Sequence, residues 1–61
     1  MPMPFAELVA LLARVDRLIA EARDIIADPT TPLQDRAIAV RDLADLNESR
    51  ARAEQILRKY G

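Results

Sequence analysis

The stretch Asp28-Pro29-Thr30-Thr31-Pro32 divides the chain into two arms that both have the pattern of a helix. Pro29 disfavours helix at Asp28, because the proline ring clashes with the residue before it. Thr31, Pro32 and Gln34 then match an N-cap, a proline at the first helical position and the glutamine of a capping box. A connection this short makes two neighbouring helices antiparallel.

The chain of 61 residues is therefore predicted to be a single all-α domain, an antiparallel helical hairpin. Pro4 suits the first turn of a helix, and Gly61 follows Arg58-Lys59-Tyr60 as a helix C-cap. The predicted bounds are a helix at 4–27, a loop at 28–31 and a helix at 32–60.

The first arm carries a wide apolar stripe. One column follows the 3,4 spacing of a coiled coil: Phe5, Leu8, Leu12, Val15, Ile19, Ala22 and Ile26. A second column lies directly beside it: Leu11, Leu18 and Ile25. This stripe is broader than the seam of a two-stranded coil, so it suits a helix that touches two neighbours. The predicted oligomer or partner interface is Leu8, Leu11, Leu12, Val15, Leu18, Ile19, Ala22, Ile25 and Ile26.

The second arm has an apolar face that changes direction along its length. One side gathers Leu33, Ala37, Val40 and Ala44, and a side more than 90° away gathers Leu46, Ala53, Leu57 and Tyr60. Normal heptad drift is only about 20° per repeat and does not explain this. Two interpretations follow. The arm is one helix whose first half packs on the first arm and whose second half packs on another chain, or it is broken near 46–49.

If the second arm is broken near 46–49, residues 40–57 resemble a known helical motif. Residues 40–57 carry a Leu43-Ala44 pair, then Ser49-Arg50, then apolar positions at Ala53 and at Ile56-Leu57. This segment resembles the helix-turn-helix half of small bacterial and phage DNA-binding regulators, although its turn is one residue short and has Asn47 in place of glycine. The resemblance implies a degenerate helix-turn-helix at 43–58. The residues that it would turn toward the DNA major groove are Ser49, Arg50, Arg52 and Gln55.

The same residues also have a purely structural interpretation. Acidic and basic side chains stand four positions apart three times in succession, as Glu48 with Arg52, Arg50 with Glu54, and Glu54 with Arg58. Such pairs are typical of a solvated helix surface. With nine basic and ten acidic residues, the chain also lacks an overall attraction for nucleic acid.

The composition limits the kinds of interaction that can stabilise the fold. A chain this short buries only about 60% of the surface that its unfolded form exposes. It has neither cysteine nor histidine, so disulfides and the common zinc sites are excluded as means of stabilising the fold. Self-association or a partner remains. No cofactor, no metal and no catalytic residue is predicted, because the chain has no histidine base and no glycine-rich loop.

We therefore expect a non-enzymatic helical interaction or assembly module that oligomerises through the first arm, with a dimer forming a four-helix bundle. The alternative is a small DNA-binding regulator. The polar face of the first arm mixes both signs of charge, which argues against a membrane-surface role. A cytoplasmic location, or one within a phage assembly, is expected. Eight arginines against one lysine and eleven alanines suggest a GC-rich source, phage or actinobacterial.

Overall fold

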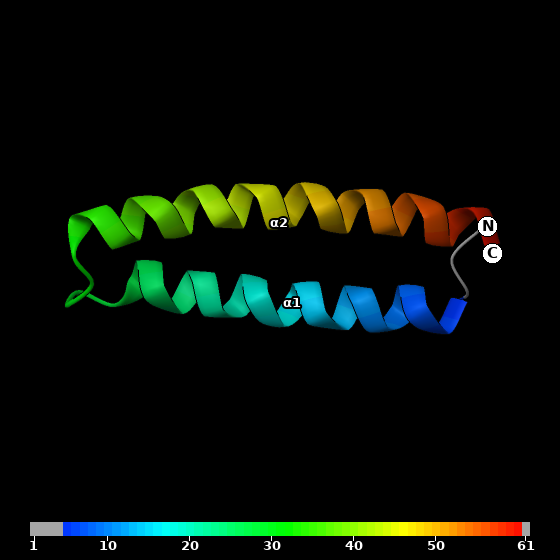
Figure 1. Cartoon of the computed structure of the whole chain (residues 1–61), viewed down its shortest axis with the longest axis horizontal. Helices are drawn as coiled ribbons and strands as arrows, with labels where there is room; N and C mark the ends of the chain where they lie inside the picture. The colour runs from blue at the N-terminus through cyan, green and yellow to red at the C-terminus, as the bar shows by residue number, and fades with distance from the viewer. Residues whose placement is uncertain (1–4, 61) are drawn as a thin grey trace.

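The structure is a computed structural model that describes residues 5–60, in which two helices are joined by a short loop. Helix α1 spans Phe5–Ala27 and helix α2 spans Leu33–Tyr60. They lie side by side and antiparallel along their whole length (Figure 1), in a body of 43 × 17 × 15 Å. The prediction of an all-α helical hairpin is confirmed. The predicted roles of Pro4 and Gly61 fall outside the described residues.

The first apolar column of α1 is the side that packs on α2. Leu8, Val15, Ile19 and Ala22 are buried. Leu12 and Ile26, which continue the column, are half-buried. Phe5 belongs to the same column but is 58% exposed, at the open end of the hairpin. The heptad pattern therefore identified the side of α1 that faces its neighbour.

Helix α2 is continuous, and residues 46–49 are helical. Its most protected positions include buried Ala39 and Ala53 and half-buried Arg36, Leu43, Leu46 and Leu57. These positions, together with Arg50 between Leu46 and Ala53, follow an unbroken 3,4 spacing from residue 36 to residue 57. Both halves of α2 therefore pack on α1.

The expectation that the first half of α2 packs on α1 through Leu33, Ala37, Val40 and Ala44 was wrong. All four are exposed, and Leu33 is 80% exposed. The first half packs instead through Ala39 and Leu43, and the set expected to meet another chain, which includes Leu46, Ala53 and Leu57, packs on α1. The change of direction in the pattern arose because two positions of this 3,4 row are arginines, of which Arg36 is half-buried and Arg50 is exposed.

Hydrogen bonds from the residues that follow Asp28 back to Asp28 hold the loop in place. The Asp28 Oδ1 atom accepts hydrogen bonds from the backbone N–H of Thr30, at 2.9 Å, and from the Thr30 hydroxyl, at 2.7 Å. The Thr31 N–H donates to the Asp28 carbonyl at 3.2 Å. This is the turn chemistry typical of aspartate, whose short side chain bonds the backbone two residues ahead.

These contacts favour the charged form of Asp28. The hydrogen bond from the Thr30 hydroxyl lowers the pKa of the Asp28 carboxyl most, followed by the hydrogen bond from the Thr30 backbone, and the charge of Arg36 lowers it further. The carboxyl is fully exposed, so the loop hydrogen bonds, rather than burial, set this direction.

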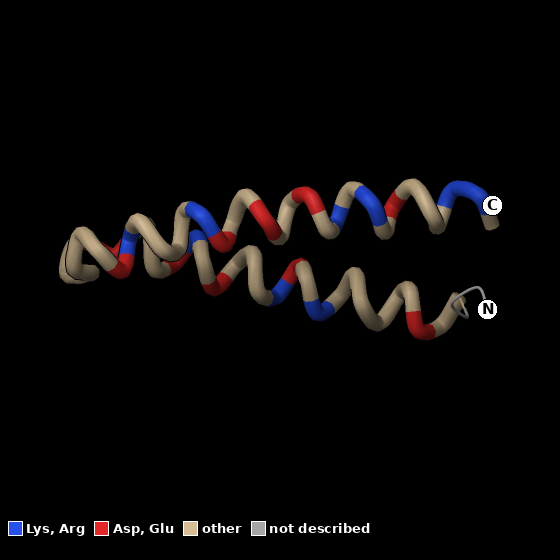
Figure 2. The backbone as a smooth tube through the Cα atoms, turned by 45° about the horizontal axis from the view of Figure 1, so that its top comes forward, with Lys and Arg blue, Asp and Glu red and all other residues tan. Residues whose placement is uncertain are grey.

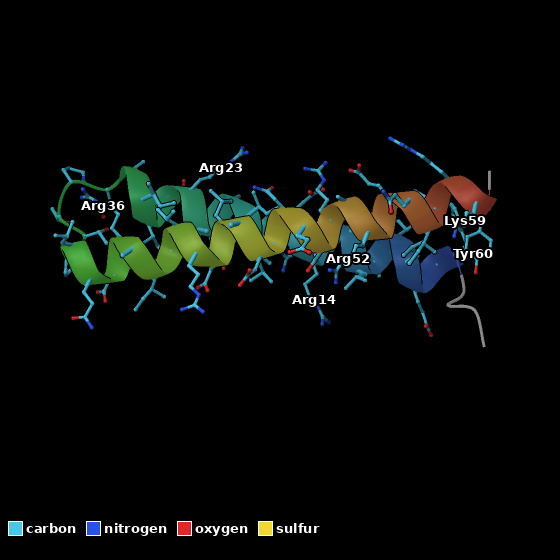
Figure 3. All side chains as sticks on the ribbon, turned by 90° about the horizontal axis from the view of Figure 1, so that it is seen from above. Arg14, Arg23, Arg36, Arg52, Lys59 and Tyr60 are labelled. Atoms are coloured by element: carbon cyan, nitrogen blue, oxygen red, sulfur yellow. The ribbon has the colours of Figure 1, made fainter. Side chains whose placement is uncertain are left out.

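Arg36 in the first turn of α2 reaches back to the end of α1. Its Nη2 atom donates to the Asp28 carbonyl at 3.1 Å and lies 3.4 Å from the Thr31 carbonyl. Figure 3 shows Arg36 at the loop end of the hairpin. Helix α1 has no basic residue in its own last turn. Arg36 therefore brings a positive charge from the other helix to the negative end of the α1 dipole.

Candidate interaction surface

The two long sides of the hairpin differ in chemistry. On one side an ion pair joins the helices: Arg50 Nη1 lies 3.1 Å from Asp16 Oδ1, and Arg50 Nε lies 3.1 Å from Glu54 Oε1. These side chains are about half exposed, so each pair contributes little to stability, roughly 0–1 kcal/mol. The pairs place charged groups on this side, which also carries the exposed side chains of Val9 and Val40.

The other side carries the second apolar column of α1. Leu18 lies about 160° around α1 from Asp16, since each residue advances the helix by about 100°. Leu11, Leu18 and Ile25 are 38%, 40% and 44% exposed. Two isoleucines of α2 border the same side, Ile38 and Ile56, which are 53% and 43% exposed. We call Leu11, Leu18, Ile25, Ile38 and Ile56 the open apolar face.

Shallow grooves between the helices connect these residues. One is lined by Leu18, Ile25, Ala39 and Leu46, and the next, toward the loop, by Ile25, Ile38 and Ala39. A third groove, toward the open end, is lined by Leu8, Leu11, Ala53 and Ile56. The open apolar face therefore follows the length of the hairpin, instead of forming an enclosed pocket.

Charge is distributed unevenly along this face. Toward the loop the grooves are bordered by acidic residues, Glu21, Asp35, Asp42 and Asp45. Toward the open end, Arg14 lies beside Leu11, and Arg52 lies beside Ile56. Figure 2 shows further basic residues at the carboxyl end of α2, Arg58 and Lys59 of its last turn, of which Arg58 lies about 160° around the helix from Ile56. Glu7 lines the same groove as Arg14, and Arg52 is paired with Glu48. The loop half of the face is therefore acidic, whereas the open end carries charges of both signs.

The structure separates the residues of the predicted interface into two groups. Six of the nine face α2 and are buried or half-buried within the hairpin: Leu8, Leu12, Val15, Ile19, Ala22 and Ile26. The other three, Leu11, Leu18 and Ile25, remain exposed. Only this second group is available to another chain, and its contact with one stays a prediction.

The residues predicted to contact nucleic acid do not share one side of α2. Ser49 and Arg52 line the groove at the open end of the hairpin. Arg50 lies about 160° around the helix from Arg52, where it is paired with Asp16 and Glu54. Gln55 is exposed. Arg52 pairs with Glu48 at 2.7 Å, so two of the three pairs predicted along this helix are present. Nucleic-acid binding stays a prediction.

Sequence analysis did not select Ile38 and Ile56 as surface candidates. Neither belongs to the two groups of apolar residues that were recognised on the second arm. Once positions 36, 39, 43, 46, 50, 53 and 57 are known to face α1, both isoleucines fall just beside that row. A heptad assignment that admitted arginine at inward positions could have found them.

Comparison with protein families, curated proteins and solved structures gives no match to this chain. Within residues 5–60, no group of acidic residues is arranged to hold a metal ion. Neither of the two described helices has the length and apolar character needed to cross a membrane.

Proposed function

We propose that this chain is a non-enzymatic helical interaction module, an adaptor or accessory protein that acts by docking its open apolar face on another helical surface. The observation that carries the proposal is the exposure of Leu11, Leu18 and Ile25 in a regular row beside the hairpin core. Full burial of one leucine or isoleucine is worth about 1.5–3 kcal/mol, so covering the remaining exposed part of these three side chains adds about 2–4 kcal/mol to a total typically of only 5–15.

The arrangement of the open apolar face supports its use as a docking surface. The side with Asp16, Arg50 and Glu54 already satisfies its charges within the chain. The open apolar face places apolar side chains at its centre and charged residues around them. An apolar centre with a polar rim is the usual anatomy of a protein interface.

A photo-reactive amino acid placed at residue 18 tests the proposal in cells that make the protein. Because Leu18 belongs to the open apolar face, we expect the photo-reactive group at residue 18 to crosslink to a bound protein. The matched control is residue 40, where Val40 is similarly exposed but lies away from the open apolar face. Equal capture of protein at both positions, or no capture at residue 18, would contradict the proposal. Capture of nucleic acid at residue 52 instead would favour the regulator alternative.

A further inference from the structure

We infer that the open apolar face is covered by a second copy of this chain, packed antiparallel about a two-fold axis that runs perpendicular to the helices at the level of Leu18. This inference rests on the proposed function and names the partner. It follows from the order of residues along the two rows that border the face.

The row on α1 reads Leu11, Arg14, Leu18, Glu21, Ile25, with spacings of 3,4,3,4. When a second copy is laid antiparallel with Leu18 on the axis, Leu18 meets the partner's Leu18. Leu11 then lies at the level of the partner's Ile25, and Arg14 lies within one residue, about 1.5 Å, of the level of the partner's Glu21. Because a two-fold interface repeats each contact off the axis, the arrangement makes two pairs of Leu11 with Ile25, one pair of Leu18 with its own copy, and two pairs of opposite charge from α1.

The row on α2 also pairs favourably with its own copy when the two are laid antiparallel. It reads Ile38, Asp42, Asp45, Ser49, Arg52, Ile56, with spacings of 4,3,4,3,4, and its midpoint is residue 47. Laid antiparallel about that midpoint, Ile38 meets the partner's Ile56. Asp42 then lies at the level of the partner's Arg52, and Asp45 at the level of the partner's Ser49. Apolar residues pair with each other and an acid pairs with a base.

One axis can serve both rows, because their midpoints lie at the same height in the hairpin. Leu18 lines the same groove as Asp45 and Leu46, and the nearby cross-helix pair joins Asp16 to Arg50. In antiparallel helices of equal rise these contacts place Leu18 level with residues 45–48, a range that includes the midpoint at residue 47. The two rows are therefore brought into register by a single rotation.

The alternative two-fold arrangement, with the axis parallel to the helices, places the loops of both copies together. Glu21 would then lie near the partner's Asp42 and Asp45, and the acidic residues of both copies would gather at one end. Like charges brought together in this way are unfavourable. The antiparallel arrangement instead sets the acidic half of each face on the end of the other that carries Arg14 and Arg52.

The dimensions also suit a dimer. A face of 43 × 17 Å is of the order of the roughly 800 Å² per partner that a stable interface buries. Two hairpins joined this way form a four-helix bundle in which α1 lies beside the partner's α1, and α2 beside the partner's α2.

Disulfide crosslinking tests the register, since the native chain has no cysteine. We expect Leu18→Cys to form a covalent dimer with itself on mild oxidation. Leu11→Cys should not self-crosslink, but it should crosslink when mixed with Ile25→Cys. Self-crosslinking of Leu11→Cys, or failure of the mixed pair, would overturn the antiparallel register.

A charge exchange on α1 tests the same register without a new covalent bond. Arg14 and Glu21 make no ion pair within the described chain, so exchanging them leaves the hairpin contacts in place. At low salt, Arg14→Glu alone and Glu21→Arg alone should each weaken dimerisation by about tenfold, because two exposed pairs change from attraction to repulsion. An equimolar mixture of the two variants, and the double variant, should both recover wild-type affinity.

Arg23→Glu is the matched control, since Arg23 and Arg14 point to opposite sides of the hairpin (Figure 3). It should leave the dissociation constant unchanged, and circular dichroism should show equal helix content in every variant. Sedimentation supplies the affinities. A wild-type chain that remains a single copy at millimolar concentration, or a mixture that fails to recover affinity, would overturn the inference. The proposed function fails separately, when residue 18 captures no protein in cells.

Discussion

At the scale of single residues, Arg36 links the two helices at the point where the chain reverses. Its guanidinium donates to the carbonyl of Asp28 at 3.1 Å, and it supplies the cation that α1 lacks in its last turn. Its buried Nε atom has no hydrogen-bond partner in the described part of the chain, which offsets part of this gain. The net contribution of Arg36 is therefore modest.

Arg36→Met should lower the free energy of unfolding by about 1 kcal/mol, through loss of the carbonyl contact and of the charge at the α1 terminus. In a chain of this size that corresponds to a fall of about 4–8 °C in the thermal midpoint. Arg41→Met is the control, because Arg41 is exposed on the same helix. Thermal unfolding followed by circular dichroism measures the midpoints of both variants. Equal midpoints would mean that the contacts of Arg36 do not stabilise the turn.

The Asp28 carboxyl predicts an acid dependence of stability. The hydrogen bonds from Thr30 lower its pKa in the folded chain, so its charged form is bound more tightly there than in the unfolded chain. Its contribution is therefore full above the ordinary aspartate pKa of about 3.9 and is lost as the pH falls through the folded value.

Asp28→Asn keeps an oxygen that can accept the Thr30 hydrogen bonds but removes the charge. The difference in thermal midpoint between wild type and Asp28→Asn should be largest near pH 6 and should shrink on acidification below about pH 4. Asp24→Asn, which removes a nearby exposed carboxylate, is the control. A difference that is constant from pH 6 to pH 2 would contradict this role for Asp28.

At the scale of the helices, the sequence predicts α1 better than α2. Apart from Ala22, the column from Leu8 to Ile26 is made of large apolar residues at unbroken heptad spacing, so hydrophobic periodicity identifies its packing side directly. The packing side of α2 includes Arg36, Ala39 and Arg50. These side chains carry little or no hydrophobic signal, so outward residues such as Val40 dominated the pattern.

For the same reason, only part of the open apolar face could be predicted from the sequence. Leu11, Leu18 and Ile25 were found because they stand beside a clear stripe. Ile38 and Ile56 could not be assigned until the direction of α2 was known, since a helix side is defined only relative to its neighbour. Pairing across the hairpin, as between Asp16 and Arg50, depends on the register of two helices and is not a property of either arm alone.

Arg50→Leu should stabilise the hairpin by about 1 kcal/mol, because position 50 lies in the inward row of α2 and an exposed ion pair contributes less than a partly buried leucine. Arg41→Leu, an outward position on the same helix, should give no such gain. Chemical denaturation at one protein concentration measures both. If the two variants are equally stable, the inward assignment of position 50 is wrong.

At the scale of the whole molecule, the hairpin core is small. Within residues 5–60 the buried side chains are Leu8, Val15, Ile19, Ala22, Ala39 and Ala53, and three of these six are alanine. A core of this size leaves little margin over the entropy of ordering the chain. Covering the open apolar face would therefore add to the stability of a fold whose own core is small.

Association through that face makes the thermal midpoint depend on concentration. We expect the midpoint to rise by a few degrees for each tenfold increase in protein, since binding stabilises the folded form by mass action. Leu18→Gln should flatten this dependence, whereas Val40→Gln, at an exposed position on another side, should preserve it. A wild-type midpoint that is independent of concentration over a hundredfold range would argue against self-association.

Phe5 and Tyr60 lie at the same end of the hairpin, opposite the loop (Figure 1). Any polypeptide joined ahead of α1 or behind α2 therefore leaves from one tip of the rod. In an antiparallel dimer the open ends of the two hairpins lie at opposite ends of the dimer, separated by roughly the 43 Å length of a hairpin. Such a pair would work as a spacer that holds two attached cargoes apart and prevents them from meeting.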